Sequence, residues 1–111
     1  MRRLGLDVGS LYLGAVILEE DRVAAWSYRE HKGDIASGLR ALLAEPSLRG
    51  FQSAGVTGSL PEAGVLDSAL AVIEGARFLL PACRNVFSVG GVSFALILYD
   101  EAGRYREHSV N

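Results

Sequence analysis

The sequence predicts an α/β domain with a mixed sheet: a meander of three antiparallel strands, then βα units, and a hairpin at the end of the chain. Short apolar runs separated by short polar turns occur near both termini, a pattern typical of strands that pair antiparallel. Between them lie segments whose apolar residues recur at helical spacing and which end at prolines.

The first apolar runs predict three strands, at residues 3–8, 12–19 and 23–28. The first run stops at Gly9 and Ser10 and the second at an acidic turn, so the connections are short and the strands pair antiparallel. Asp7 lies near the end of the first strand, just before the glycine turn. Trp26 and Tyr28 fall on one face of the third strand, because side chains alternate along a strand.

The middle of the chain predicts a helix followed by a fourth strand. Asp34 is a favourable N-cap, and one helical face then carries Ile35, Leu39, Leu42 and Leu43 before the stop at Pro46. Gly38 costs this helix ~1 kcal/mol relative to alanine, which suggests close packing on the sheet. Residues 51–57 form the predicted strand, which ends in the turn Thr57-Gly58-Ser59. Because this strand follows a crossover helix, we expect it parallel to the first, on its other side.

The last part predicts a second helix and three more strands. After a very short apolar segment at residues 65–66, the helix extends from about Ser68 to Pro81, and the strands lie at 86–89, 94–99 and 105–110. Gly103 allows a positive φ in the hairpin loop at 100–103. The same order of elements therefore occurs at 3–28 and again at 86–110: a strand, a glycine turn, a strand, an acidic turn and a strand. In this internal comparison, Gly90 and Gly91 follow the later strand as Gly9 and Ser10 follow the first.

Composition limits the classes of function. With 111 residues the chain has room for one compact domain, residues 1–111. A net charge of −2 gives no basic face for a nucleic-acid backbone, and no apolar run approaches the ~20 residues of a membrane span. Cys83 is the single cysteine, so it forms neither an internal disulfide nor a multi-thiolate metal site. We therefore expect a cytoplasmic protein whose partners are neither nucleic acid nor membrane.

A glycine-turn hairpin repeated at the start of two lobes resembles the actin, sugar-kinase and chaperone ATPase superfamily, with its ribonuclease H-like fold. Within it the chain resembles the activator ATPases of 2-hydroxyacyl-CoA dehydratases and benzoyl-CoA reductases (the BadF/BadG/BcrA/BcrD type). The family patterns D-[IV]-G-S-T-T-T-K-A-V, G-T-T-G-S and [ED]-I-G-G-Q-D-S-K correspond to residues 7–16, 55–59 and 88–95. By this resemblance, residues 1–111 are a fragment or reduced form, and the hairpin 86–110 begins a second lobe.

The resemblance implies ATP and Mg²⁺ as cofactors. Asp7 would be the catalytic carboxylate and hold the metal through water, because strand-end carboxylates bind Mg²⁺ in this way. Backbone N–H groups of the turns would surround phosphates, at Gly9, Ser10, Thr57, Gly58, Ser59, Gly90 and Gly91. The implied partners are a second copy of the chain and a CoA-ester dehydratase or reductase component, reached through a longer parent protein.

The chain also departs from the family patterns. Leu11, Tyr12, Leu13 and Gly14 stand where the family has threonines and lysine, and Ser88 and Ser93 stand where it has acids. Apolar groups cannot coordinate phosphate or metal, and an unpaired buried polar group is costly. Cys83 does not match the cysteines that hold the family's iron–sulfur cluster. The phosphate motifs are thus expected to be degenerate, the chain alone is not expected to be catalytically competent, and its status as an enzyme stays open.

Two other functions compete with nucleotide binding. The first is a non-catalytic assembly module of the same fold, in which unpaired strand edges are a template for dimerisation. The second is a ribonuclease H-like nuclease of the Holliday-junction-resolvase type, whose first strand is similar. Two-metal cleavage needs several converging carboxylates, and beside Asp7 the chain offers only Glu62, Asp67 and Asp100 as loose candidates.

Plainer structural interpretations stand beside these hypotheses. Asp7 would accept backbone N–H bonds within its own turn, and the glycine turns would be ordinary tight turns. His31 and His108 are expected at the surface, and Cys83 as a partly buried, inert thiol. Glu74 and Arg77 form an i, i+3 surface pair. Core or interface positions are expected for the aromatic residues Trp26, Tyr28, Phe51, Phe78, Phe87 and Phe94.

Overall fold

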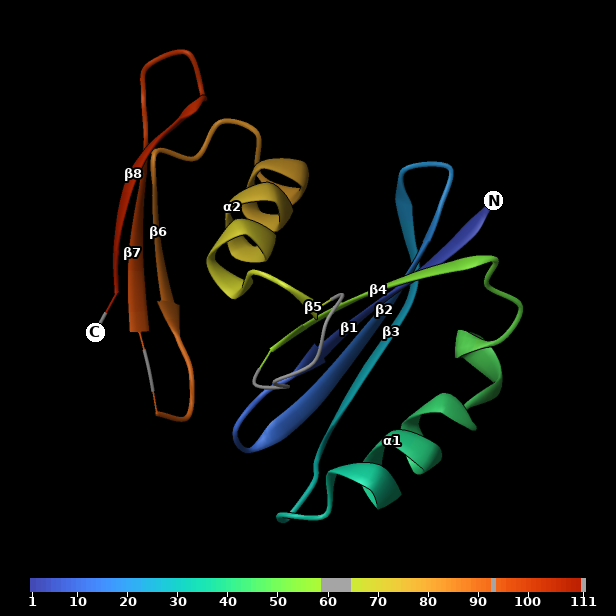
Figure 1. The fold of residues 1–111 in the computed structure, drawn as a ribbon. Coiled ribbons are helices and arrows are strands. Elements are labelled where there is room, and N and C mark those ends of the chain that lie inside the picture. Colours follow the sequence, from blue (N-terminus) through green and yellow to red (C-terminus); the bar gives the residue numbers. More distant parts are fainter. Residues whose placement is uncertain (59–64, 93, 111) are drawn as a thin grey trace. The chain divides into compact units, whose positions relative to one another are not determined.

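The computed structural model describes residues 1–58, 65–92 and 94–110. The described residues form two compact units, Met1–Leu66 and Asp67–Asn111, and each unit has its own sheet (Figure 1). The expected α/β class with a mixed sheet is confirmed. Treating residues 1–111 as one domain stays a prediction.

The first unit is built on a five-stranded mixed sheet with the order β3-β2-β1-β4-β5. Its strands are β1 (Arg2–Val8), β2 (Tyr12–Glu19), β3 (Arg22–Glu30), β4 (Ser53–Gly58) and β5 (Val65–Leu66). The antiparallel meander β1-β2-β3 is confirmed, and so is the parallel pairing of β4 with the free side of β1. β4 begins two residues later than expected, so Phe51 lies outside it. β3 extends one residue before and two residues beyond the expected run.

One face of this sheet packs against α1 (Ile35–Leu43) and a short 3-10 helix, Pro46–Leu48. The Asp34 carboxylate caps α1 by accepting a 3.0 Å hydrogen bond from Ser37 N, as the sequence predicts. A Cβ atom on Gly38 would lie 2.8 Å from Leu13 Cδ1, which confirms that the helix packs closely on β2. The buried core comprises Leu4, Val8, Leu13, Ala15, Ile17, Leu42 and Leu48.

The other face of the sheet carries exposed aromatic side chains. Trp26 and Tyr28 are 67% and 62% exposed and stack on each other, with ring centroids 6.2 Å apart. Tyr12 meets Tyr28 edge-on at 5.8 Å. A core position for Trp26 and Tyr28 is therefore wrong, because the alternation directs Ala25 and Ser27, not the aromatic rings, toward the face that α1 covers. An interface role for them stays a prediction.

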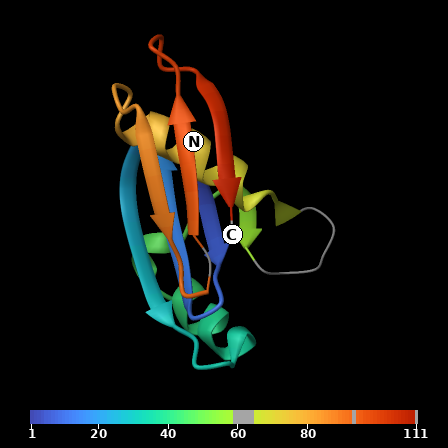
Figure 2. The same cartoon turned by 90° about the vertical axis from the view of Figure 1, so that its left-hand side faces the viewer.

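The second unit is a three-stranded antiparallel sheet covered on one face by a helix (Figure 2). Its elements are α2 (Ser68–Leu79), β6 (Asn85–Val89), β7 (Phe94–Tyr99) and β8 (Tyr105–Val110). Ile73, Ile97 and Tyr99 form its core, and the Tyr99 hydroxyl donates a 2.7 Å hydrogen bond to Ile73 O. Gly103 has φ 79°, as the hairpin loop requires.

Other expectations are settled by exposure. Cys83 is partly buried and free, and Glu74 pairs with Arg77 at 3.6 Å. Core positions are wrong for Phe51, Phe78, Phe87 and Phe94, which are all exposed.

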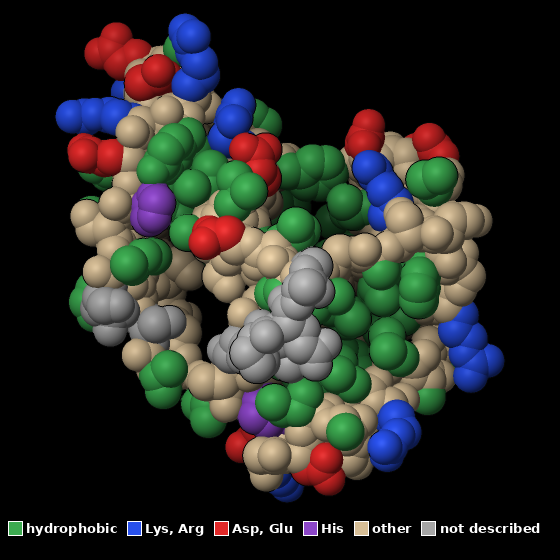
Figure 3. Space-filling model, viewed as in Figure 1, with side chains coloured by type: hydrophobic (Ala, Val, Ile, Leu, Met, Phe, Trp, Pro, Cys, Tyr) green, Lys and Arg blue, Asp and Glu red, His purple; other side chains and the backbone are tan. Residues whose placement is uncertain are grey.

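On the face shown in Figure 3, acidic and basic side chains are interspersed rather than gathered by sign. Neither helix in the described part of the chain is long and apolar enough to cross a membrane.

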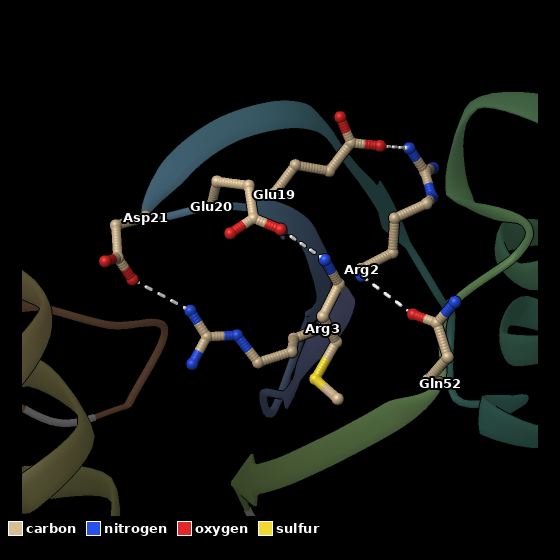
Figure 4. A network of polar contacts seen from close by, with 7 residues as sticks. Arg2, Arg3, Glu19, Glu20, Asp21 and Gln52 are labelled. Atoms are coloured by element: carbon tan, nitrogen blue, oxygen red, sulfur yellow. Dashed lines mark hydrogen bonds and ion pairs between the residues drawn. The ribbon is translucent and has the colours of Figure 1, made fainter.

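A network of polar contacts joins the start of β1 to its neighbours (Figure 4). The Arg2 backbone N–H donates to Gln52 Oε1 at 2.8 Å, and the guanidinium contacts Glu19 and donates to the carbonyls of Ser47 and Arg49. Arg3 pairs with Asp21 at 3.0 Å. These contacts hold the amino-terminal end of β1, the end opposite to the glycine turn.

Leu42→Ala should lower the free energy of unfolding of the first unit by about 2–5 kcal/mol, because truncating a fully buried leucine leaves a cavity. Leu43→Ala on the same helix is the matched control. Because Leu43 is 38% exposed, this variant should lose clearly less free energy of unfolding than Leu42→Ala. Urea unfolding followed by fluorescence of Trp26, the single tryptophan, measures both. Equal losses for the two variants would contradict the assigned core.

Candidate functional site

The carboxyl ends of β1 and β4 bring most of the candidate residues of the first unit together. The parallel register places Asp7 beside Thr57 and Val8 beside Gly58, and Gly9 and Ser10 follow directly after β1. Ligands of sheets with parallel strands commonly bind beyond such carboxyl ends. Ser59 lies outside the described residues. Gly90 and Gly91 follow β6 in the second unit, so a joint role with the first turn stays a prediction.

Gly58 ends β4 in a conformation that only glycine adopts readily. Its φ is 122°, and a Cβ atom there would overlap the carbonyl oxygen of Val8. The two strand ends therefore approach each other closely at this point. Thr57, one residue earlier, donates from its hydroxyl to Leu66 O at 2.8 Å.

The turn between β1 and β2 is closed by a hydrogen bond from Gly9 N to Tyr12 O, 2.9 Å long. A Cβ atom on Gly9 would lie 2.9 Å from the same oxygen, so the turn requires glycine here. Among the described residues, no acceptor pairs with the backbone N–H of Ser10 or Leu11. The tip of the turn therefore presents donors that an anion can use.

His31 is a residue of this site that sequence reasoning missed. It is only 8% exposed, so the expected surface position is wrong, whereas His108 is exposed as expected. Its Nε2 lies 3.0 Å from Gly9 O, and its Nδ1 accepts a 3.0 Å hydrogen bond from Gly33 N. Because Nδ1 accepts, the neutral ring carries its proton on Nε2 and donates to Gly9. The antiparallel β2–β3 register, which pairs Tyr12 with Glu30, is the signal that could have placed residue 31 beside the turn.

Asp7 differs from the other aspartates of the described residues, because no described group donates a hydrogen bond or forms an ion pair with its carboxylate. The plainer interpretation, in which Asp7 accepts N–H bonds of its own turn, is therefore not what the structure contains. Although the side chain reaches solvent, partial burial of the carboxyl raises its pKa, since desolvation disfavours the charged form.

The remaining aspartates have structural partners. Asp67 caps α2 by accepting a 2.9 Å bond from Leu70 N. Asp100 accepts 2.9 Å bonds from the N–H groups of Arg104 and Ala102, and these hydrogen bonds lower its pKa. Glu62, the third acid considered for a nuclease, lies outside the described residues. In the part of the chain that is described, no three His, Cys, Asp or Glu side chains are grouped so that they could hold a metal ion.

The substituted positions after Ser10 separate into two kinds. Leu13 is fully buried in the core. Leu11 and Tyr12 are 48% and 50% exposed, so apolar side chains lie next to the free N–H groups of the turn. The turn therefore offers anion contacts from its backbone, not from the side chains that follow Ser10.

The structure is similar to several solved structures, and the likeness covers the whole of this chain. The activator of 2-hydroxyisocaproyl-CoA dehydratase from Clostridium difficile, with bound ADPNP, matches with a TM-score of 0.78 and 22% identity, over 100% of this chain and 46% of that one. Component A of (R)-2-hydroxyglutaryl-CoA dehydratase from Acidaminococcus fermentans matches at 0.78 and 20%, over 100% and 47%. The Ppx/GppA protein of Aquifex aeolicus matches at 0.61 and 11%, over 100% and 51%.

The chain spans about half the length of the structures it matches. No protein-family description and no curated protein sequence matches it. Identities of this size demonstrate a common fold, and the resemblance to the dehydratase activators seen in the sequence motifs is confirmed at that level. The chain has the fold of about half of each of these solved structures.

Gly58→Ala should destabilise the first unit by at least about 1–3 kcal/mol, the range for a strained backbone, because φ is positive and the new methyl group meets Val8 O. Gly14→Ala is the control in the same unit: a Cβ there would meet only the Cβ of Asp7, at 3.8 Å, which is an ordinary contact. Trp26 fluorescence during urea unfolding reports the difference. A Gly58→Ala variant as stable as wild type would contradict the close approach of the strands.

Asp7→Asn should gain more stability over wild type at neutral pH than at about pH 3. Because the folded-state pKa of Asp7 is raised, the charged carboxylate reduces stability as the pH rises through that pKa, and this loss is absent below the unfolded value. Asp100→Asn should instead lose more stability relative to wild type at neutral pH than at about pH 3. The reason is that the pKa of Asp100 is lowered, so the stability that its carboxylate contributes disappears as the pH falls. Denaturation followed by circular dichroism over this pH range measures both, and the same trend in the two variants would contradict the assignment.

Proposed function

We propose that this chain is a nucleotide-binding domain whose first glycine turn binds a phosphate group of ATP or ADP together with Mg²⁺. The observation that carries the proposal is the juxtaposition at the carboxyl end of β1. There, Asp7 is partly desolvated and lacks a partner among the described residues, and the turn that follows its strand presents the free N–H groups of Ser10 and Leu11. Anionic ligands use such backbone donors, and Mg²⁺ in phosphate sites is held by one or two carboxylates.

The residues present suit such a ligand. Gly9 and Gly58 leave out side chains that would collide with the neighbouring backbone, so the strand ends stay close to the turn. The N–H groups of Ser10 and Leu11 would donate to phosphate oxygens, and Asp7 would hold Mg²⁺ through water. When bound, Mg²⁺ neutralises phosphate charge. The phosphate contact that the sequence motif predicts for Gly90 and Gly91, which follow β6 in the second unit, is not part of this proposal.

The proposal is for binding and does not extend to hydrolysis by this chain alone. Leu11 is apolar and the Tyr12 ring meets Tyr28 edge-on, so neither replaces the threonines of the family pattern. Because the solved structures with this fold are about twice as long, a complete site would need the other half of the fold. In the finer form of the proposal, a longer protein would serve a CoA-ester dehydratase or reductase component in the cytoplasm as a homodimer, as the neighbours' names suggest.

A non-catalytic assembly module is the second candidate. The exposed stack of Trp26 and Tyr28 on the uncovered face of the first sheet favours it, because exposed apolar patches commonly mark interaction sites. This candidate predicts self-association or partner binding without any dependence on nucleotide, so the experiment below separates the two.

Titration calorimetry with ADP and ATP, with and without Mg²⁺, tests the proposal. Wild type should bind both nucleotides, and more tightly with Mg²⁺. Asp7→Asn should weaken the Mg²⁺-dependent binding by about tenfold or more, equal to about 1.4 kcal/mol. Asp21→Asn is the matched control, because it makes the same charge change in the turn between β2 and β3, where Asp21 pairs with Arg3.

Two results would contradict the proposal. The first is the absence of binding heat up to millimolar nucleotide. The second is equal Mg²⁺-dependent affinity for wild type, Asp7→Asn and Asp21→Asn. Nucleotide-independent dimerisation, measured by light scattering, together with the first result would favour the assembly module.

A further inference from the structure

We propose that His31 is the positioning residue of the phosphate-binding turn: its neutral ring fixes the Gly9 carbonyl and thereby directs the Ser10 N–H toward an anion. This inference rests on the proposed nucleotide-binding function and assigns a role to a residue outside the glycine motifs. His31 acts through the backbone of the turn and does not itself contact the ligand.

The first step is the hydrogen bond between Nε2 and Gly9 O, 3.0 Å long. A peptide group is planar and trans, so the carbonyl of Gly9 and the N–H of Ser10 point in opposite directions. Holding the carbonyl against the buried ring therefore directs the Ser10 N–H away from His31. Among the described residues this N–H has no acceptor, which leaves it available to a ligand.

The ring is itself held in place from other directions. Gly33 N donates to Nδ1 at 3.0 Å, and the backbone N–H of His31 donates to Leu11 O at 3.1 Å. On the helix side, the Cβ position of Gly38 lies 3.3 Å from the Cβ of His31, so α1 leaves little room behind the residue. Both residues that flank Ser10 are thus bonded to His31, one through the ring and one through the backbone.

This arrangement prepares the turn before a ligand arrives. Fixing donors in advance lowers the entropy lost on binding, which raises affinity without adding a contact. The Nε2–H is the essential group, because it is the donor that holds Gly9. A side chain that keeps a donor at this position should keep part of the function, and an apolar side chain of similar size should not.

The test compares His31→Gln, whose amide NH₂ can replace the Nε2 donor, with His31→Asn, whose shorter amide replaces Nδ1, and with His31→Leu, which has no donor. Tripolyphosphate and Mg²⁺-ADP are the probes, measured by calorimetry on the full chain. His31→Leu and His31→Asn should bind each probe about tenfold more weakly than wild type, and His31→Gln should recover part of the loss. His108→Leu, at an exposed histidine of β8, should bind like wild type.

Amide spectra of ¹⁵N-labelled protein supply a readout of the turn itself. In wild type, tripolyphosphate should shift the Ser10 and Leu11 resonances, and in His31→Asn these shifts should be reduced while resonances of β6–β8 keep their folded positions. If His31→Leu does not fold, the Gln and Asn pair still decides, because both side chains are polar amides that differ in reach.

The outcomes separate this inference from the proposed function. Equal affinities and equal Ser10 shifts in wild type, His31→Gln and His31→Asn overturn the role of His31 while nucleotide binding stands. If wild type binds the probes, and His31→Gln keeps part of this affinity whereas His31→Asn does not, the result supports both the inference and the proposed function. If wild type binds neither probe, the proposed function is wrong, and the inference is overturned with it.

Discussion

The parallel pairing of β1 with β4 is the constraint on which the candidate site depends. It places Asp7 beside Thr57 and Val8 beside Gly58, so residues about fifty positions apart in the sequence end at the same edge of the sheet. The pairing in turn requires the crossover through α1, whose Leu42 seals the core on one face. Core packing and site geometry therefore both follow from this crossover connection. Gly58 has no side chain, which permits the end of β4 to approach the end of β1 closely.

The aspartates of the described residues differ in whether their carboxylates have a structural partner. Asp34 and Asp67 cap helices, Asp100 holds the last hairpin turn, and Asp21 pairs with Arg3. In each case the charge contributes to local structure. Asp7 instead has a raised pKa from partial burial and no compensating partner within the described part of the chain. A partly desolvated carboxylate without a described partner, on the strand that leads into this turn, is the observation behind the proposed site.

Local sequence signals predicted most of the fold. They did not predict the features that depend on contacts between segments far apart in the sequence. The meander, the cap of α1 and the parallel fourth strand follow from apolar periodicity, Asp34 and the crossover rule, whereas the cap of α2 at Asp67 was not predicted. The same signals brought Asp7, Gly9 and Gly58 to one edge. They could not show which face of the sheet α1 covers, so they could not decide between a core and an interface position for Trp26 and Tyr28, which lie on the other face. They also could not show that His31 is buried, because that depends on where the β2–β3 register returns the chain to the turn.

At the first turn, backbone N–H groups and side chains would have different roles. In the proposed function, the backbone binds a phosphate although the side chains that follow Ser10 differ from the family pattern. Phosphate contacts from Ser10 and Leu11 would come from N–H groups, whose direction is set by Gly9 and by the ring of His31, so they do not depend on which side chains follow. The family pattern places threonines and lysine after Ser10, whereas this chain has the apolar Leu11 and a Tyr12 whose ring meets Tyr28 edge-on. Leu13, by contrast, has a packing role in the core. In the function that we propose, the turn keeps a preorganised anion site in its backbone, which is why the proposal is for binding and not for turnover.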